Sequence, residues 1–436
     1  HEYEAVFFYG TDVLLILVPV LFWMISYLRL PLQEKDEEEG DLFPPSRRGG
    51  GLRWGFWALS AFILLSATSV FFAVSKWSAV YQLARLAMLV VFAFVSARLL
   101  RDGIVSLRNV FVALGFSAVF QAFIGFFQFV AQKSLGLRFL GESFLNTEMA
   151  GVAKIAVEGG RYLRAYGTLP HPNVLGAFLV IGLLSLCGLA LSHESRKDTN
   201  LRIKNIFILL GIACITFGLV LTFSRAAWLV AIFSVLAITG WGFLNRERRS
   251  RALGLLLMFS FSAVLAIAPI RDLVFVRAGV SVTEPAVTAR LAYNDLARDL
   301  IKEKPWGVGL GNQVLYSVKN GLYQKLGMNE VWMWQPIHNL YLLIIAETGI
   351  IAGAVFFAFL FSLLISNDLK SSSPESRLEG RSISLIMLLV LLILGLFDHY
   401  LWTLNAGQLM LWLIIGIIMG SGPRKHGLRG RHSENI

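Results

Sequence analysis

The sequence has little charge and little cysteine. Only 15% of its 436 residues are charged, whereas 56% are hydrophobic and 13% are aromatic. This is far more apolar surface than a soluble core of that length can bury, so composition predicts a polytopic membrane protein. The two cysteines, Cys187 and Cys214, both lie within apolar runs, which argues against a disulfide framework and against a thiolate metal site.

Several functional classes lack their expected signals. The formal net charge of +11 would suit nucleic acid, but the basic residues lie between hydrophobic runs rather than in one patch, so no nucleic-acid partner is expected. No repeat of fixed period stands out, and no matched, Gly/Pro-broken spans indicate the symmetry of a transporter. The glycines of Pro305–Asn312 follow no strand and lack a Walker lysine, which argues against nucleotide binding.

Apolar segments predict an all-α fold with about eleven transmembrane helices in one membrane domain, residues 1–436. Most of these segments are long enough to cross the roughly 30 Å hydrocarbon core as helices. The expected spans are 10–28, 54–74, 77–97, 109–131, 173–192, 205–222, 226–244, 252–269, 339–366, 383–401 and 404–420.

Lys and Arg gather in alternate connections, which are expected to lie in the cytoplasm. The long loops 132–172 and 270–338 then face outward from the cytoplasmic (inner) membrane. The N-terminus would also face outward with neither a Met nor a signal peptide, so we expect that one initial span is missing. The basic connections are 29–53, 98–108, 193–204, 245–251, 367–382 and the tail after 420.

The first outward loop ends in a run of basic and aromatic residues. Arg161 and Arg164 would share a face if this segment were helical, giving a donor pair suited to phosphate oxygens. Tyr166 lies beside them, and His171 stands between two prolines that stiffen the entry to the next helix. That helix could begin with Asn173 as its cap. An ordinary interfacial Arg/Tyr belt with a capping turn is the competing interpretation.

Two further arginines lie at or near the predicted outer face. Arg225 stands between two apolar spans with almost no loop to carry it to water. It could snorkel to the outer interface, or it could serve a function, because a tight outward hairpin normally avoids Arg. Arg85 would join it if its span is deep enough at that point.

The second outward loop combines an amphipathic helix with a histidine. The pattern over Val287–Glu303 predicts a helix at the outer interface, with Arg290 among its polar positions. The loop ends at His338 and Asn339, where it enters an apolar helix. Ionisable residues at such depth are functional candidates by default, although His338 could instead cap the helix or bond to the loop.

These motifs, taken in order, resemble the O-antigen ligase and polymerase superfamily. They spread over residues 155–360, which the resemblance marks as an O-antigen ligase-related core, and the first 150 residues hold nothing specific to the family. The motifs are Arg164–Thr168 with His171–Asn173, Thr222–Arg225, Pro305–Gly309, and His338–Asn339 with Gly349 and Gly353.

The resemblance implies a C-type membrane glycosyltransferase with a large extracytoplasmic loop and about twelve spans, in agreement with one missing here. Such an enzyme moves a glycan from an undecaprenyl-diphosphate carrier to an acceptor hydroxyl on a lipid or another glycan, in the biosynthesis of lipopolysaccharide and other cell-surface polysaccharides. It works at the outer face of the cytoplasmic membrane with neither a cofactor nor a metal. Ligase and polymerase differ in their acceptor, and both stay open.

The residues suit this chemistry. Negative charge develops on a leaving diphosphate, and arginines in a low-dielectric pocket can stabilise it in place of Mg²⁺. No Asp-rich or His-rich cluster of metal-ligand type accompanies the arginines in the sequence. His338 can act as the general base that takes the proton of the acceptor hydroxyl. The expected catalytic residues are His338 and Arg225, and the expected substrate-binding residues are Arg164, Arg290, Arg161, Tyr166, His171, Asn339 and Arg85.

Two points stay open. Asp398 and His399, at the outer end of a span, could line the same pocket, lend His338 a partner, or form a satisfied interfacial turn. A secondary transporter, a lipid flippase and a non-catalytic membrane scaffold are the functions that compete with glycan transfer.

Overall fold

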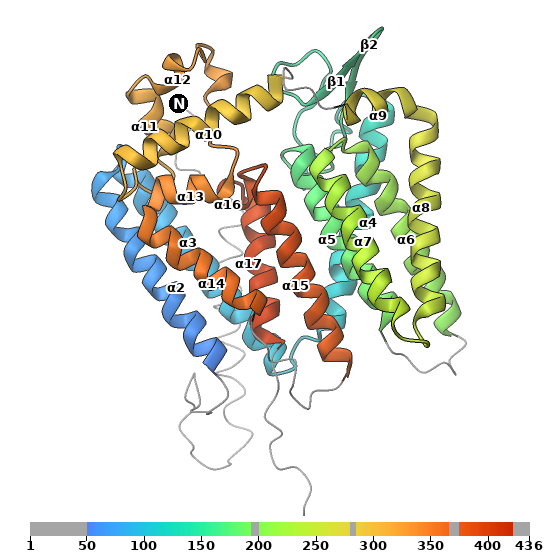
Figure 1. Ribbon diagram of the computed structural model, residues 1–436. Coiled ribbons are helices and arrows are strands. Elements are labelled where there is room, and N and C mark those ends of the chain that lie inside the picture. Colours follow the sequence, from blue (N-terminus) through green and yellow to red (C-terminus); the bar gives the residue numbers. More distant parts are fainter. Residues whose placement is uncertain (1–49, 193–199, 280–284, 366–374, 422–436) are drawn as a thin grey trace, which may run out of the picture.

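The protein is a bundle of long helices with short elements gathered at one end (Figure 1). The computed structural model describes residues 50–192, 200–279, 285–365 and 375–421. Its long helices are α2 (Gly50–Thr68), α3 (Lys76–Arg101), α4 (Leu107–Ala131), α5 (Pro172–Leu191), α6 (Asn200–Leu221), α7 (Arg225–Phe243), α8 (Arg249–Ile267), α14 (Ile350–Ile365), α15 (Glu375–Gly395) and α17 (Asn405–Gly420).

The short elements lie mainly at the end of the bundle that also holds the two long loops (Figure 1). They are η2 (Ser69–Phe72), η3 (Arg138–Leu140), β1 (Lys154–Val157), β2 (Gly160–Leu163), η4 (Ala268–Ile270), α9 (Arg271–Ala278), α10 (Pro285–Glu303), α11 (Gln313–Lys319), α12 (Leu322–Lys325), η5 (Val331–Met333), α13 (Leu340–Thr348) and α16 (Tyr400–Thr403).

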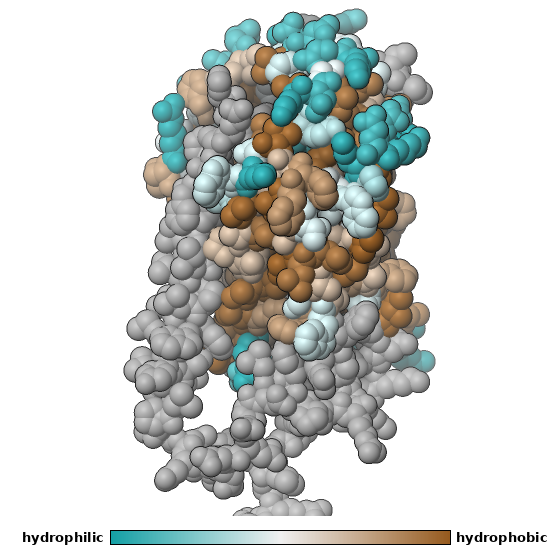
Figure 2. Space-filling view, turned by 90° about the vertical axis from the view of Figure 1, so that its left-hand side faces the viewer, coloured by the Kyte–Doolittle hydropathy of each residue, from teal (hydrophilic) through white to brown (hydrophobic). Residues whose placement is uncertain are grey.

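The helices confirm a mostly helical, multi-pass membrane protein. Within the described residues, 6 helices are long and apolar enough to cross a membrane, and further apolar helices of 10–17 residues stand beside them. Figure 2 shows an apolar band along the helices and polar side chains gathered above it. The expected span at 10–28 lies outside the described residues, so the total of about eleven stays a prediction.

Close helix contacts in the core depend on small residues. Helix α5 is the most enclosed of the candidate spans. A Cβ atom added to its Gly182 would lie 2.1 Å from the Cβ of Ala118 in α4, and one added to Gly176 would lie 2.7 Å from the Cβ of Ala227 in α7. Small residues at such crossings let backbones approach closely, which is how membrane helices gain packing without a hydrophobic drive between them. Cys187, also in α5, is a buried free thiol.

The expected single span 339–366 is divided, and that expectation was wrong. Helix α13 ends before Gly349, whose φ of 92° lies in the region that favours glycine, and α14 begins directly after it. The turn that starts at Pro305 packs against the break, because the Ile350 amide donates to the Pro305 carbonyl at 2.9 Å and the Val308 amide donates to the Ala346 carbonyl at 2.9 Å. The break therefore connects the second long loop to the bundle.

The first long loop contains a hairpin rather than a helix. Strands β1 and β2 are antiparallel, with Ala156 opposite Arg161. The conditional expectation that Arg161 and Arg164 share a helical face was wrong, because Arg161 lies within β2 and Arg164 follows the end of that strand. Helix α9 of the second loop packs against β1. The two long loops thus meet at one end of the bundle.

Replacing Gly349 by Ala is expected to destabilise the protein by about 1–3 kcal/mol or more, since a side chain there needs a strained backbone. Its Cβ would also lie 2.7 Å from the carbonyl carbon of Trp306. Thermal unfolding in detergent measures the effect. Gly240→Ala in α7 is the control, because a Cβ there meets no heavy atom within 4 Å. Equal melting temperatures for the two variants would contradict the tight contact at the break.

Candidate functional site

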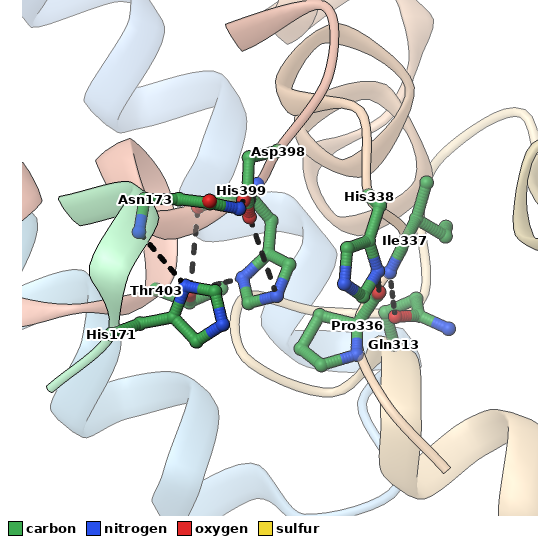
Figure 3. Close-up of polar contacts among 9 residues, drawn as sticks. All are labelled: His171, Asn173, Gln313, Pro336, Ile337, His338, Asp398, His399 and Thr403. Carbon is green, nitrogen blue, oxygen red and sulfur yellow. Dashed lines mark hydrogen bonds and ion pairs between the residues drawn. The ribbon is translucent and has the colours of Figure 1, made fainter. Parts of the chain in front are cut away.

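Two histidines and a carboxylate from distant segments meet beneath α10. The rings of His338 and His399 stand edge to face, with centroids 4.8 Å apart and planes at 87°. Asp398 lies next to His399 in the loop between α15 and α16 (Figure 3). On its other side, His338 stacks on Tyr293 of α10, with ring centroids 5.1 Å apart and planes at 12°. The Tyr293 hydroxyl donates to the Met333 carbonyl at 2.6 Å, which fixes that ring.

The local backbone determines which nitrogen of His338 carries the proton. Its Nδ1 lies 2.9 Å from the Pro336 carbonyl oxygen. Because a carbonyl only accepts, neutral His338 keeps its proton on Nδ1 and leaves the Nε2 lone pair available. Burial and the positive charge of Arg290 lower the pKa of His338, although Asp398 and the Pro336 carbonyl act in the opposite direction. The ring is therefore neutral at pH 7 and has a basic nitrogen.

Asp398 is an ionised carboxylate with both oxygens engaged. Its Oδ1 accepts from the backbone amide of His399 at 2.8 Å, and its Oδ2 accepts from the side-chain amide of Asn173 at 2.8 Å. Burial raises the pKa of Asp398, but His399, His338, His171 and the Asn173 hydrogen bond outweigh burial and lower it to about 2. Burial lowers the pKa of His399 to about 4, so a negative charge lies among neutral rings at pH 7.

Asn173 connects this cluster to a buried arginine. Its Oδ1 accepts from Nη2 of Arg164 at 2.9 Å, and Nε of Arg164 donates to the Thr222 carbonyl at 2.7 Å. Arg164 is only 6% exposed. Burial, together with the charge of Arg277, lowers the pKa of Arg164 to about 9, so the guanidinium still carries its proton at pH 7.

Three arginines surround the turn between α6 and α7, residues Thr222–Arg225. Arg164 donates to the Thr222 carbonyl, and Nε of Arg277 donates to the Phe223 carbonyl at 3.1 Å. Arg225 begins α7, and its Nη1 donates to the Gly279 carbonyl just after α9 at 3.0 Å. Phe223 is fully buried with a φ of 49°, a sparsely populated conformation for a bulky residue that surrounding contacts must hold. The turn thus concentrates positive charge at the loop end of the bundle.

The entry to α5 differs from the expectation. The expected cap, Asn173, was wrong, because His171 is the N-cap and its Nδ1 accepts from the Asn173 amide at 3.1 Å. Pro172 follows at the first helical position, where its missing amide proton costs nothing. This shift of two residues leaves the Asn173 side chain to bridge Arg164 and Asp398. Burial and the charge of Arg164 lower the pKa of His171 to about 3.

The remaining expected site residues are dispersed. Arg161 is exposed on the hairpin, and Arg85 is buried within α3 at 3% exposure. The Tyr166 hydroxyl accepts from the Ala153 amide at 2.7 Å, so this residue secures the first loop. Asn339 caps α13, since its Oδ1 accepts from the amides of Tyr341 and Leu342 at 3.0 and 3.1 Å. Their roles in binding stay predictions.

The fold also assembles a group that could hold a metal ion, which the sequence did not indicate. Ligand atoms of His338, Asp398 and His399 all lie within 4.8 Å of one another. The group arises because α16 packs against α13, which brings together residues about sixty positions apart. Arg290 lowers the pKa of both histidines. The carboxylate of Asp398 raises the pKa of both histidines, and by more than Arg290 lowers it.

Three members of the site escaped the sequence argument. Tyr293 and Arg277 looked like ordinary residues of the second loop, and only the packing of α10 and α9 gives them a place. Asn173 was expected as a helix cap and as the last residue of the His171–Asn173 motif. The i, i+3 spacing of Arg290 and Tyr293 in an expected amphipathic helix was the one available signal.

Fold and site together define a multi-pass helical membrane protein with an arginine-rich and histidine-containing cluster under a loop cap, in which Arg164 and Asp398 are buried. A model of the O-antigen ligase family matches residues 210–357. This match supports membership of the chain in the O-antigen ligase superfamily and confirms the resemblance found in the sequence. It spans α7 to α13, and with them Arg225, Arg277, Arg290 and His338. No curated protein gives a significant match to the chain.

Replacing Asn339 by Ala is expected to destabilise the protein by about 1 kcal/mol, because the first turn of α13 loses its capping acceptor. Asn339→Ser keeps a side-chain oxygen at that position and should retain most of the stability. Thermal unfolding of the two variants in detergent makes the comparison. If Asn339→Ser lowers the melting temperature as much as Asn339→Ala does, Asn339 does not stabilise the protein by capping α13.

Proposed function

We propose that this protein transfers a glycan from an undecaprenyl-diphosphate carrier to an acceptor hydroxyl, at the outer face of the cytoplasmic membrane. Membership of the superfamily supports an enzyme of the ligase or polymerase type with lipid-linked glycan and acceptor substrates in general. The proposal takes residues 155–360 as the functional core and a C-type glycosyltransferase architecture for the whole. Ligase activity is our first choice, and polymerase activity is the alternative.

The observation that carries the proposal is the joining of two kinds of group in one cluster, in which Arg164 and Asp398 are buried. Arginines lie around the Thr222–Arg225 turn, and a neutral histidine with a basic Nε2 lies on the other side. Asn173 connects the two sides through Arg164 and Asp398. A transfer between a diphosphate donor and a hydroxyl acceptor needs both kinds of group: cations for the leaving diphosphate and a base for the hydroxyl proton.

In the proposed reaction the acceptor hydroxyl loses its proton to Nε2 of His338, and its oxygen forms a bond to the anomeric carbon. The bond between that carbon and the carrier phosphate breaks, and its electron pair leaves with undecaprenyl diphosphate. Arg164, Arg225 and Arg277 stabilise the negative charge that develops there, and burial strengthens the interaction of Arg164 most. A single displacement of this kind inverts the anomeric carbon.

The proposal uses no metal. The positive charge that a divalent cation would supply to a diphosphate is available from arginines, which also present forked donors to its oxygens. Arg290 adds to the positive potential around His338 and His399.

A test of sidedness uses single cysteines in a variant that lacks Cys187 and Cys214. Arg298→Cys on the exposed face of α10 is expected to react with a membrane-impermeant maleimide in intact spheroplasts, whereas Arg246→Cys after α7 should react only after lysis. Both positions are exposed, so access to the reagent decides the outcome. The opposite pattern would place the site in the cytoplasm and sink the proposed function.

His338→Ala is expected to lower the rate of transfer by roughly a hundredfold or more, the usual contribution of a general base. The assay measures release of undecaprenyl diphosphate from a lipid-linked oligosaccharide in vesicles with a lipid A–core acceptor, in the presence of a chelator. Because the pKa of His338 is lowered, the wild-type rate should hold down to about pH 6.5 and fall only as the pH drops through that lowered value. The rate of the His338→Ala variant should not show this fall at acidic pH.

Arg298→Ala is the matched control, since its guanidinium pairs with Asp295 on the solvent face of α10. Its rate should stay at the wild-type value. An unchanged rate in His338→Ala would remove the base from the proposal, and a rate lost on chelation would remove its metal independence. Uptake or lipid flipping that survives the His338 substitution would favour the transporter class.

A further inference from the structure

One amide side chain separates a buried cation from a buried anion. Asn173 donates from Nδ2 to Oδ2 of Asp398 at 2.8 Å and accepts at Oδ1 from Nη2 of Arg164 at 2.9 Å. Its own backbone amide is held by Nδ1 of His171 at 3.1 Å, at the rigid start of α5 (Figure 3). Both ends of the amide are therefore committed, and the backbone that carries it is fixed.

The amide makes both of these contacts because it carries a donor and an acceptor at its two ends. A carboxylate in its place would accept from Arg164 but could not donate to Asp398, and an aliphatic group could do neither. The intervening amide also prevents a direct ion pair. If Arg164 and Asp398 met directly, each charge would neutralise the other, and a forked guanidinium bound by a carboxylate presents fewer donors to phosphate oxygens.

The proposed function needs these charges in different places. Arg164 lies at the Thr222–Arg225 turn, on the side assigned to the diphosphate, whereas Asp398 lies among His399, His338 and His171. We propose that Asn173 is a positioning residue, which orients Arg164 toward the donor diphosphate and Asp398 toward the histidines while keeping the two charges unpaired with each other. This inference rests on the proposed function.

The test compares Asn173→Asp, Asp398→Asn and the double variant. In Asn173→Asp, the new carboxylate forms an ion pair with Arg164 and repels Asp398. In the double variant the hydrogen-bonded chain is complete again, because Asn at 398 can donate to Asp at 173, but the negative charge has moved from the histidines to the arginine. The total charge of the cluster is the same as in the wild type.

Kinetics and unfolding are measured on the full-length protein in vesicles. Asn173→Asp should raise the KM for the lipid-linked donor roughly tenfold or more, the usual effect of losing a charge-assisted contact. Asp398→Asn, which leaves the contact between Asn173 and Arg164 in place, should keep that KM within about twofold while its kcat falls. The double variant should regain the wild-type melting temperature and keep the raised donor KM.

A merely structural role gives a different result. If Asn173 only stabilised the fold, the double variant would recover donor KM together with stability, and that recovery would overturn the inference. A wild-type donor KM in Asn173→Asp would overturn it as well.

Binding of undecaprenyl diphosphate, followed by fluorescence, separates this failure from failure of the proposed function. A wild-type protein that neither binds this lipid nor transfers glycan would refute the function. A wild-type protein that binds it, with variants that bind it equally well, would refute only the role of Asn173.

Discussion

The rest of the site depends on the burial of the Arg164 guanidinium. A charged group that is removed from water needs hydrogen-bond partners. Without them, the free-energy cost of its desolvation exceeds the stabilisation from the surrounding packing. Arg164 donates to the Thr222 carbonyl in the α6–α7 turn and to the side-chain oxygen of Asn173 in α5. The guanidinium therefore fixes the relative position of the first long loop, the α6–α7 turn and the start of α5. Asn173 in turn extends the network to Asp398 and the histidines.

A second constraint holds the other half of the site. The break at Gly349 lets α13 end at the loop end of the bundle instead of continuing along α14. The buried carboxylate of Glu347, at the end of α13, accepts from the Trp402 indole at 2.8 Å and so attaches α16. Since His399 is the residue before α16 and His338 lies just before α13, this one carboxylate helps to hold the two rings together. The break at Gly349 and the Glu347 carboxylate thus help to position His338 and His399 without contacting them.

The sequence was sufficient for the class and for the ends of most helices, because long apolar runs and alternating basic connections are direct consequences of the membrane. It also marked His338 and Arg164 as candidates, because a histidine and an arginine beside apolar helices are costly and hence noticeable. The sequence-based prediction failed where a single residue determines the backbone conformation. Gly349 broke a run that reads as a single span, and His171 rather than Asn173 became the helix cap. The sequence left open whether Asp398 and His399 lie beside His338, because that contact depends on helix packing. Tyr293 was missed for the same reason.

Opposing influences determine the charge of the two histidines in the cluster. Burial lowers the pKa of His338 and of His399, the Asp398 carboxylate raises it, and Arg290 lowers it to a smaller extent. A diphosphate bound at the arginines would bring further negative charge close to these histidines. Proton acceptance by Nε2 of His338 would then become easier only once the donor is bound, which couples donor binding to activation of the acceptor hydroxyl.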